Sequence, residues 1–142
     1  MKVSARNVFE GRIQALVPGP VNTEVTLELP GGDALVAVIT QASARDLGLA
    51  VGGQAMAIVK APWVIVAAGD GGPRFSSRNQ LRGVVSAVRS GPINADVAIQ
   101  LPGGATVHAV ITQEAAAELG LAPGVPARAV IKASHVVLAV QG

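Results

Sequence analysis

Two short stretches of the chain carry residue types that could do chemistry, and each occurs twice. The tetrapeptide "SARN" at residues 4–7 returns as "SSRN" at residues 76–79, and Lys60 returns as Lys132. Serine, arginine and lysine all donate hydrogen bonds, and the last two carry positive charge. The serine and arginine stand two residues apart, so in an extended segment they point to the same face. A planar arginine fork beside a compact lysine charge predicts a site for a tetrahedral oxyanion.

The acidic residues refine the kind of anion expected. Only two acidic positions recur, Glu24 with Asp96 and Asp46 with Glu118, and no repeated carboxylate accompanies the Ser-x-Arg pair in the sequence. A site made of donors alone suits an anion without a proton, which favours sulfate-like or molybdate-like dianions over phosphate. The alternative is structural: the arginine and the lysine could cover the barrel ends and pair with acids.

The repetition extends far beyond these residues. Sliding the chain by 72 positions aligns residues 4–66 with 76–138 without a gap, and 29 of the 63 aligned pairs are identical. Such self-similarity is typical of a duplicated structural unit. We therefore predict one domain over residues 1–67 and a second over 76–142, joined by a Gly-rich linker at 68–75.

Each copy has the pattern of a small β-protein. Polar and apolar residues alternate over 21–29, as in a half-buried strand, and "PGG" provides the turn into a second strand at 34–40. Thr40 can cap a short helix that ends at Gly48 in a left-handed conformation. Two further strands are expected within 52–66, separated at Pro62. With the opening strand at 8–17, this predicts an all-β chain of two tandem OB-like small β-barrels, each with one short helix.

Composition excludes several classes of function. The 142 residues are 50% apolar and 14% charged, with a net charge of +2 and no cysteine. There is no basic cluster for a phosphate backbone, no apolar run long enough to span a membrane and no export signal, so we expect a soluble, cytoplasmic protein with neither a nucleic-acid nor a membrane partner. Catalytic motifs are missing, and the only histidines, His108 and His135, lack counterparts in the first copy. We expect neither an enzyme nor a bare-metal site.

Size suggests that the chain associates. A unit of about 66 residues buries only about 60% of its chain surface and is marginally stable by itself. Proteins of this size are usually reinforced by disulfides, a metal or association. Since the first two are not expected here, association between the repeats, and between chains, is predicted.

In order and in both copies, the motifs SxRN, GxxN, T-x(7)-GL and KA resemble the molybdate-binding Mop domain of the molbindin family, in its tandem di-Mop arrangement. The resemblance covers the whole chain outside the linker. It implies a homotrimer with oxyanion sites between subunits, molybdate or tungstate as the ligand, and intracellular storage or buffering without chemistry. An OB-type nucleic-acid-binding module is the alternative, although its usual stacking aromatics are scarce here, with only Phe9, Phe75 and Trp63.

The same resemblance assigns residues to the anion sites. The implied contacts are Ser4, Arg6, Lys60, Ala61, Ser76, Arg78, Lys132 and Ala133, with the lysine segments expected from a neighbouring subunit. Ser134, which replaces Pro62, adds a hydroxyl that could join a site, so the two halves could differ in affinity. Two turns expected near the trimer axis contribute the second set: Gly19, Pro20, Val21, Asn22, Gly91, Pro92, Ile93 and Asn94.

Overall fold

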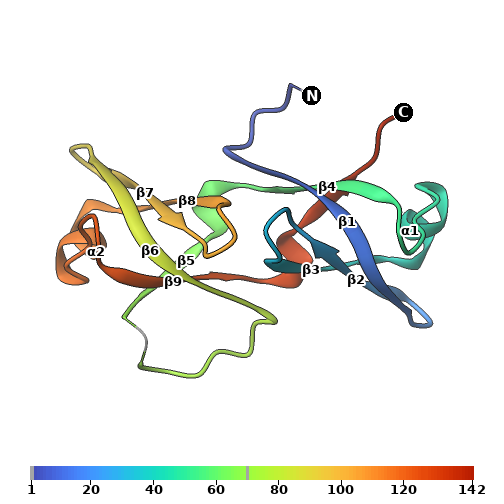
Figure 1. Ribbon diagram of the computed structural model, residues 1–142. Helices are drawn as coiled ribbons and strands as arrows, with labels where there is room; N and C mark the ends of the chain where they lie inside the picture. Colours follow the sequence, from blue (N-terminus) through green and yellow to red (C-terminus); the bar gives the residue numbers. More distant parts are fainter. Residues whose placement is uncertain (1, 70) are drawn as a thin grey trace.

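The computed structural model describes residues 2–69 and 71–142 and shows two β-barrels side by side (Figure 1). The first repeat contains β1 (Asn7–Pro18), β2 (Asn22–Glu28), β3 (Ala34–Thr40), α1 (Gln41–Asp46), β4 (Gln54–Val59), the 3-10 turn η1 (Ala61–Trp63) and β5 (Ile65–Ala68). The second repeat contains β6 (Asn79–Ser90), β7 (Asn94–Gln100), β8 (Thr106–Thr112), α2 (Gln113–Glu118), β9 (Pro126–Ile131), the 3-10 turn η2 (Ala133–His135) and β10 (Val137–Ala139). The predicted all-β class with tandem barrels is confirmed.

The two repeats exchange their last strands. The strand order of one sheet is β10-β4-β1-β2-β3, and that of the other is β5-β9-β6-β7-β8. Ile65 of the first repeat therefore pairs with Val130 of the second, and Val137 of the second pairs with Ile58 of the first. Each barrel has the expected five strands but takes the fifth from the other repeat. The division of the chain at 67/68 and 75/76 remains a prediction, and β5 continues through Ala68.

Local sequence accounts for the element boundaries. The Thr40 hydroxyl accepts a hydrogen bond from the Ser43 amide at 3.1 Å, and Thr112 caps α2 in the same way. Gly48 ends the first helix with a φ of 64°, as the sequence predicts. Pro62 lies within η1, where a missing amide hydrogen is tolerated and the strand path turns toward the other barrel.

The barrels enclose a continuous apolar core. Along β2 the side chains of Val25 and Leu27 are 0% and 1% exposed, which confirms the alternation expected for a half-buried strand. Residues of the two exchanged strands belong to this apolar core: Val66 of β5 packs with the second barrel, and Leu138 of β10 packs with the first. Because each core is completed by the other repeat, the strand exchange overcomes the marginal size of a single unit.

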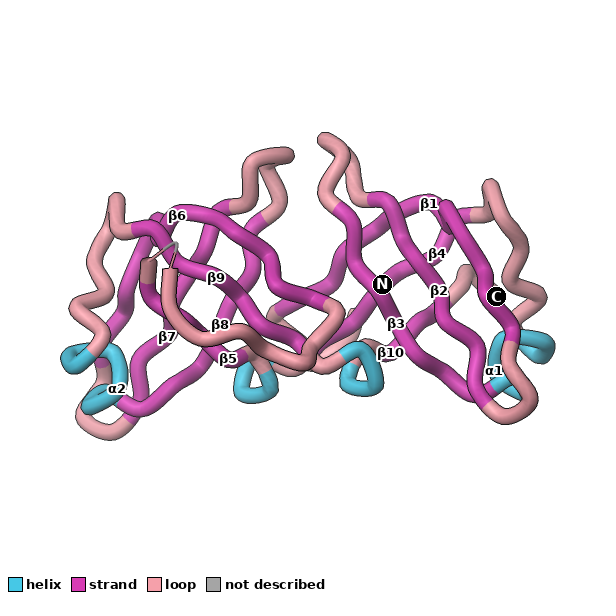
Figure 2. The backbone as a smooth tube through the Cα atoms, turned by 90° about the horizontal axis from the view of Figure 1, so that it is seen from below, coloured by secondary structure: helices cyan, strands magenta, loops and turns pink. Residues whose placement is uncertain are grey.

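The repeats are related by an approximate two-fold arrangement (Figure 2). The helices α1 and α2 lie at the outer ends, and the two 3-10 turns lie between the barrels. The β2–β3 and β7–β8 turns meet, since a Cβ on Gly31 would collide with the Gly103 carbonyl, and the Gly103 amide donates to Asp33 Oδ2 at 3.0 Å. In the described part of the chain, no helix is long and apolar enough to cross a membrane.

Candidate oxyanion site

The asparagine of each SxRN segment joins the two repeats. Asn7 is 1% exposed, and its side-chain amide donates to the His108 carbonyl and accepts from the His108 amide, both at 2.7 Å. Asn79 makes the same pair of bonds with Val36, at 2.7 and 2.8 Å. His108 and Val36 lie on β8 and β3, which are edge strands of their sheets. The asparagine amides thus satisfy backbone groups that an edge strand would otherwise leave unpaired.

The arginine of each segment also reaches the other repeat. Arg6 forms an ion pair with Asp96, and Arg78 forms one with Glu24 at 2.6 Å. Glu24 and Asp96 occupy the same position of the two repeats, so the contacts are reciprocal. The arginine side chains are 54% and 58% exposed, whereas the side chains of Asp96 and Glu24 are 19% and 30% exposed.

These ion pairs correct one sequence inference. A repeated carboxylate does accompany the Ser-x-Arg pair, although the sequence suggested that none does. The recurrence of Glu24 and Asp96 was visible in the sequence, but their partners are 54 and 90 positions away along the chain and belong to the other repeat. The argument that a protonated anion would meet only donors therefore no longer holds. The alternative that the arginines pair with acids describes the contacts that Arg6 and Arg78 make.

Strand register brings the repeated arginine and lysine of each copy together. Asn7 pairs with Val59 at the end of the β1–β4 ladder, so Arg6 and Lys60 are the residues that lie next to this last pair, just outside the two strands. Asn79 pairs with Ile131 in the same way, and this places Arg78 beside Lys132. Both lysines are exposed, and neither makes an ion pair within residues 2–69 and 71–142. The antiparallel register thus places a lysine beside the arginine of its own repeat, and the contribution of a lysine segment from a neighbouring subunit remains a prediction.

A single hollow contains all five predicted anion contacts of the second repeat. Its volume is about 380 Å³, and its lining includes Ser76, Arg78, Lys132, Ala133 and Ser134. The rest of the lining is largely apolar and includes Val38 and Ile65 from the first repeat. A small polar cluster on an apolar wall is the usual composition of a ligand site. The predicted contacts supply two positive side chains and two hydroxyls, and Ser77 adds a third hydroxyl to the lining, which is the chemistry expected around an oxyanion.

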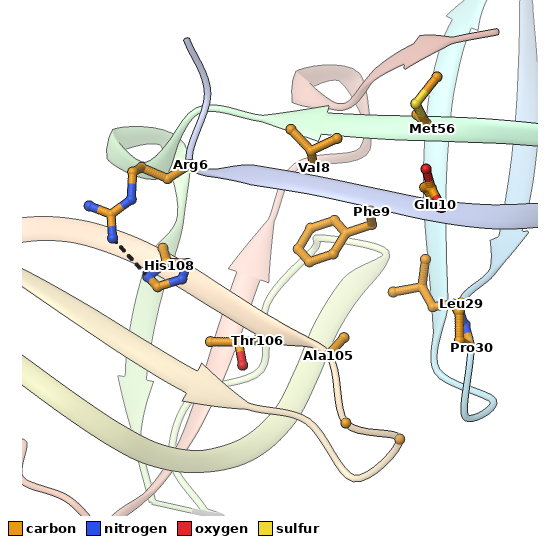
Figure 3. Close-up of a pocket in the computed structure, with 12 residues that line it drawn as sticks. Arg6, Val8, Phe9, Glu10, Leu29, Pro30, Met56, Ala105, Thr106 and His108 are labelled. Atoms are coloured by element: carbon orange, nitrogen blue, oxygen red, sulfur yellow. Dashed lines mark hydrogen bonds between the residues drawn. The ribbon is translucent and has the colours of Figure 1, made fainter. Parts of the chain in front are cut away.

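In the first repeat, fewer of the predicted anion contacts line a hollow. Of its predicted contacts Ser4, Arg6, Lys60 and Ala61, only Arg6 lines the hollow of about 690 Å³ shown in Figure 3. There the Arg6 guanidinium points toward His108, with 3.4 Å between Nη2 and Nδ1, while Phe9 and Met56 lie farther along the wall. His108 Nδ1 is also 3.5 Å from an Asp96 oxygen. Since Val36 occupies the position of His108 in the other copy, the two sites differ.

The two turns predicted to lie near the trimer axis, at residues 19–22 and 91–94, are largely exposed and have similar geometry. The Gly19 amide donates to the Asn22 carbonyl at 2.8 Å, and Gly91 repeats this bond with Asn94. Val21 and Ile93 are 71% and 73% exposed. Pro20 and Pro92 precede them in the same turns. Asn22 lines a third hollow, of about 540 Å³, together with Ser134, so the structure places one residue of this set near the exchanged segment of the other repeat.

Arg128 is a buried charged residue that the sequence did not single out. It is 7% exposed and donates to the carbonyls of Gly71 and Pro73 at 3.0 and 3.4 Å. Its guanidinium also lies over the Phe75 ring, 5.3 Å from the centroid. Its counterpart in the first repeat is Met56, and this change from an apolar to a charged residue was the only available signal. Arg128 holds the linker against the second barrel.

The described residues contain no group of three or more histidine, cysteine or acidic side chains placed to hold a metal ion.

The fold and the site together define a tandem β-barrel protein with basic, donor-rich hollows at its repeat junction. The chain belongs to the TOBE domain family, whose pattern matches residues 3–66 and 76–138. The predicted membership of the molbindin group, which carries such tandem domains, is confirmed.

Similar proteins include both sequence relatives and a solved structure. The molybdenum-pterin-binding protein MopA of Rhodobacter capsulatus is 45% identical over 139 residues, which cover 98% of this chain and 52% of that protein. The molybdenum transport protein ModE of Azotobacter vinelandii is 43% identical over 142 residues, 100% of this chain and 52% of that protein. This chain thus spans about half the length of these two relatives.

The structural comparison covers both chains in full or nearly so. The cytoplasmic molybdate-binding protein ModG, solved with molybdate bound, superposes with a TM-score of 0.94 and is 52% identical, covering 99% of this chain and 100% of that one. None of these three similar proteins bears the name of an enzyme.

Proposed function

We propose that this protein binds molybdate, with tungstate as the closest alternative ligand, and stores or buffers it in the cytoplasm without chemical conversion. The observation that carries the proposal is the hollow lined by Ser76, Arg78, Lys132, Ala133 and Ser134. Two cationic side chains and three serine hydroxyls, Ser77 included, line it from two segments that are 54 or more positions apart in the chain. The likeness to ModG, which was solved with molybdate bound, over the full length of both chains supports the choice of anion.

The nucleic-acid alternative lacks a stacking surface. OB-type modules that bind single strands stack bases on exposed aromatic rings. Here Phe9 is 8% exposed and the Phe75 ring is covered by the Arg128 guanidinium. Trp63 is 45% exposed but packs against His135. Together with a net charge of only +2, this arrangement favours a small anion over a polynucleotide.

We further propose that the chain forms a homotrimer. Support comes from apolar side chains that remain exposed at equivalent positions of both repeats, Val21 with Ile93 and Ile65 with Val137. Ile65 also lines the hollow of the second repeat, so a neighbouring chain that covers this residue would help to close the site. Light scattering should give the mass of three chains at micromolar concentration, and a monodisperse monomer would contradict the proposal.

Calorimetric titration of the dialysed protein with molybdate tests the function. We expect saturable binding that persists at 0.15 M salt, where exposed charges are largely screened beyond about 8 Å. Sulfate at the same concentration is the control for a merely basic surface. Equal affinity for the two anions would contradict a molybdate site. Mass spectrometry of the protein as purified should detect molybdenum or tungsten in stoichiometric amounts.

A further inference from the structure

The arginines that we assign to the oxyanion sites already have anionic partners within the chain. Arg78 lines the hollow with Lys132 and Ser134, yet its guanidinium donates to Glu24 at 2.6 Å. Arg6 is held by Asp96 in the equivalent way. The contact occurs in both copies although one acid is glutamate and the other aspartate. A repeated contact made with side chains of different length indicates that the pairing itself matters.

We propose that Glu24 and Asp96 are internal competitors for the oxyanion: each carboxylate holds its arginine while the site is empty and must release it when the anion binds. These two acids would therefore set the affinity of the sites. This inference rests on the proposed function, because it assigns a regulatory role to residues that contact the anion-binding arginines. A carboxylate and a tetrahedral oxyanion both present a pair of oxygens to the planar guanidinium fork, so they compete for the same donors.

The geometry allows the arginine to change partners while the acid stays in place. Glu24 lies within β2 and Asp96 within β7, and their side chains are 30% and 19% exposed. Each arginine lies just before its strand begins, and its side chain is more than half exposed. Glu24 does not line the hollow that contains Arg78, so the carboxylate approaches the guanidinium from outside the hollow.

The strength of these pairs suits a reversible contact. A fully exposed ion pair changes an equilibrium by about fivefold at most. Here the acids are largely buried, but the arginine side chains are 54% and 58% exposed, so each guanidinium stays open to water and to another anion. A dianion in the hollow of the second repeat meets both Arg78 and Lys132, and this lysine makes no ion pair with any residue that the structure describes. The anion therefore has more positive charge to gain than the single carboxylate, and it displaces the carboxylate at a modest cost in affinity.

Neutral variants of the 142-residue chain test this role by calorimetric titration with molybdate. We expect Glu24→Gln with Asp96→Asn to bind about two- to fivefold more tightly than wild type at low salt, with a smaller gain at high salt. Glu114→Gln with Glu118→Gln is the matched control, since it also removes two negative charges, here from exposed residues of α2 that pair with neither arginine. It should leave the affinity unchanged.

A conservative exchange separates competition from a purely structural role. Asp96→Glu places in the second repeat the acid that the first repeat already has, so it should keep the wild-type affinity, whereas Asp96→Asn should not. If wild type binds molybdate but the Glu24→Gln, Asp96→Asn variant binds no more tightly than the Glu114→Gln, Glu118→Gln control, the competitor role is wrong and the proposed function stands. If wild type binds no molybdate, the proposed function fails and this inference fails with it.

Discussion

Trp63 and His135, which occupy the same position of the two repeats, pack against each other with ring centroids 5.2 Å apart and planes inclined by 41°. The contact joins η1 to η2 across the approximate two-fold arrangement. Each of these turns directly follows a repeated lysine, Lys60 in one case and Lys132 in the other. The only tryptophan of the protein is therefore close in sequence to one candidate site and in contact with the segment that forms the other.

We expect Trp63 fluorescence to report oxyanion binding. An anion bound by Lys132 and Ser134 would change the field and the packing around the adjacent His135, and through it the emission of the indole. Titration with molybdate should give a saturable change at the same concentrations as calorimetry. In His135→Ala the change should shrink although binding persists. An identical response in both proteins would contradict the contact as its route.

The arginines should carry much of the binding energy. Removing one partner of a close charged contact typically costs about 2–5 kcal/mol when the contact is buried and less when it is exposed. We expect Arg78→Ala to weaken molybdate binding at least tenfold. Arg45→Ala, which alters an unrepeated arginine of α1, is the control and should change little. Calorimetric affinities that fall equally in both variants would rule out the assignment.

The asparagine contacts should stabilise the docking of the repeats. Asn79→Ala removes both bonds to Val36 and leaves a backbone amide and carbonyl without partners, at a cost of about 1–3 kcal/mol. We expect Tm to fall by several degrees, and Asn7→Ala to behave alike. Gln14→Ala, which removes only an exposed 3.4 Å contact with Glu28, should leave Tm nearly unchanged. Melting followed by circular dichroism distinguishes these outcomes.

Arg128 should control the accessibility of the linker. Arg128→Met introduces the residue found at the equivalent position of the first repeat and removes the bonds to Gly71 and Pro73. The linker should then detach from the second barrel more often, which makes the bond after Arg74, already an exposed residue, more accessible to protease. Trypsin should cut after Arg74 several-fold faster than in wild type, while Arg82→Met, a change at an exposed arginine of β6, should not accelerate it. Unchanged cleavage would show that other contacts hold the linker.

Bound anion should stabilise the folded protein. A ligand that binds only the folded state contributes about 2.7 kcal/mol per site at a hundredfold excess over Kd. Molybdate should therefore raise Tm clearly, and sulfate, whose shorter bonds fill the same site less well, should raise it less. Melts at matched ionic strength remove general screening from the comparison. Equal shifts with both anions would indicate a basic surface instead of a selective site.

Local sequence predicted the elements of each barrel because the forces that specify them act between near neighbours. The alternation of Val25 and Leu27 with polar residues, the cap at Thr40 and the left-handed glycine at Gly48 all appear as expected. The repeat identified the serine, arginine and lysine positions, and the antiparallel register of β6 and β9 then placed Arg78 beside Lys132. These features need no knowledge of how the two repeats are arranged.

The sequence by itself determined two small β-barrels and the residue types of an oxyanion site. Only the tertiary structure decided which repeat completes each barrel and which acids face the arginines. The exchange of β5 and β10 cannot be read from the chain, because the two repeats have nearly the same apolar pattern and each fifth strand would fit either sheet. The Arg78–Glu24 and Arg6–Asp96 pairs depend on that docking, since each joins residues of different repeats.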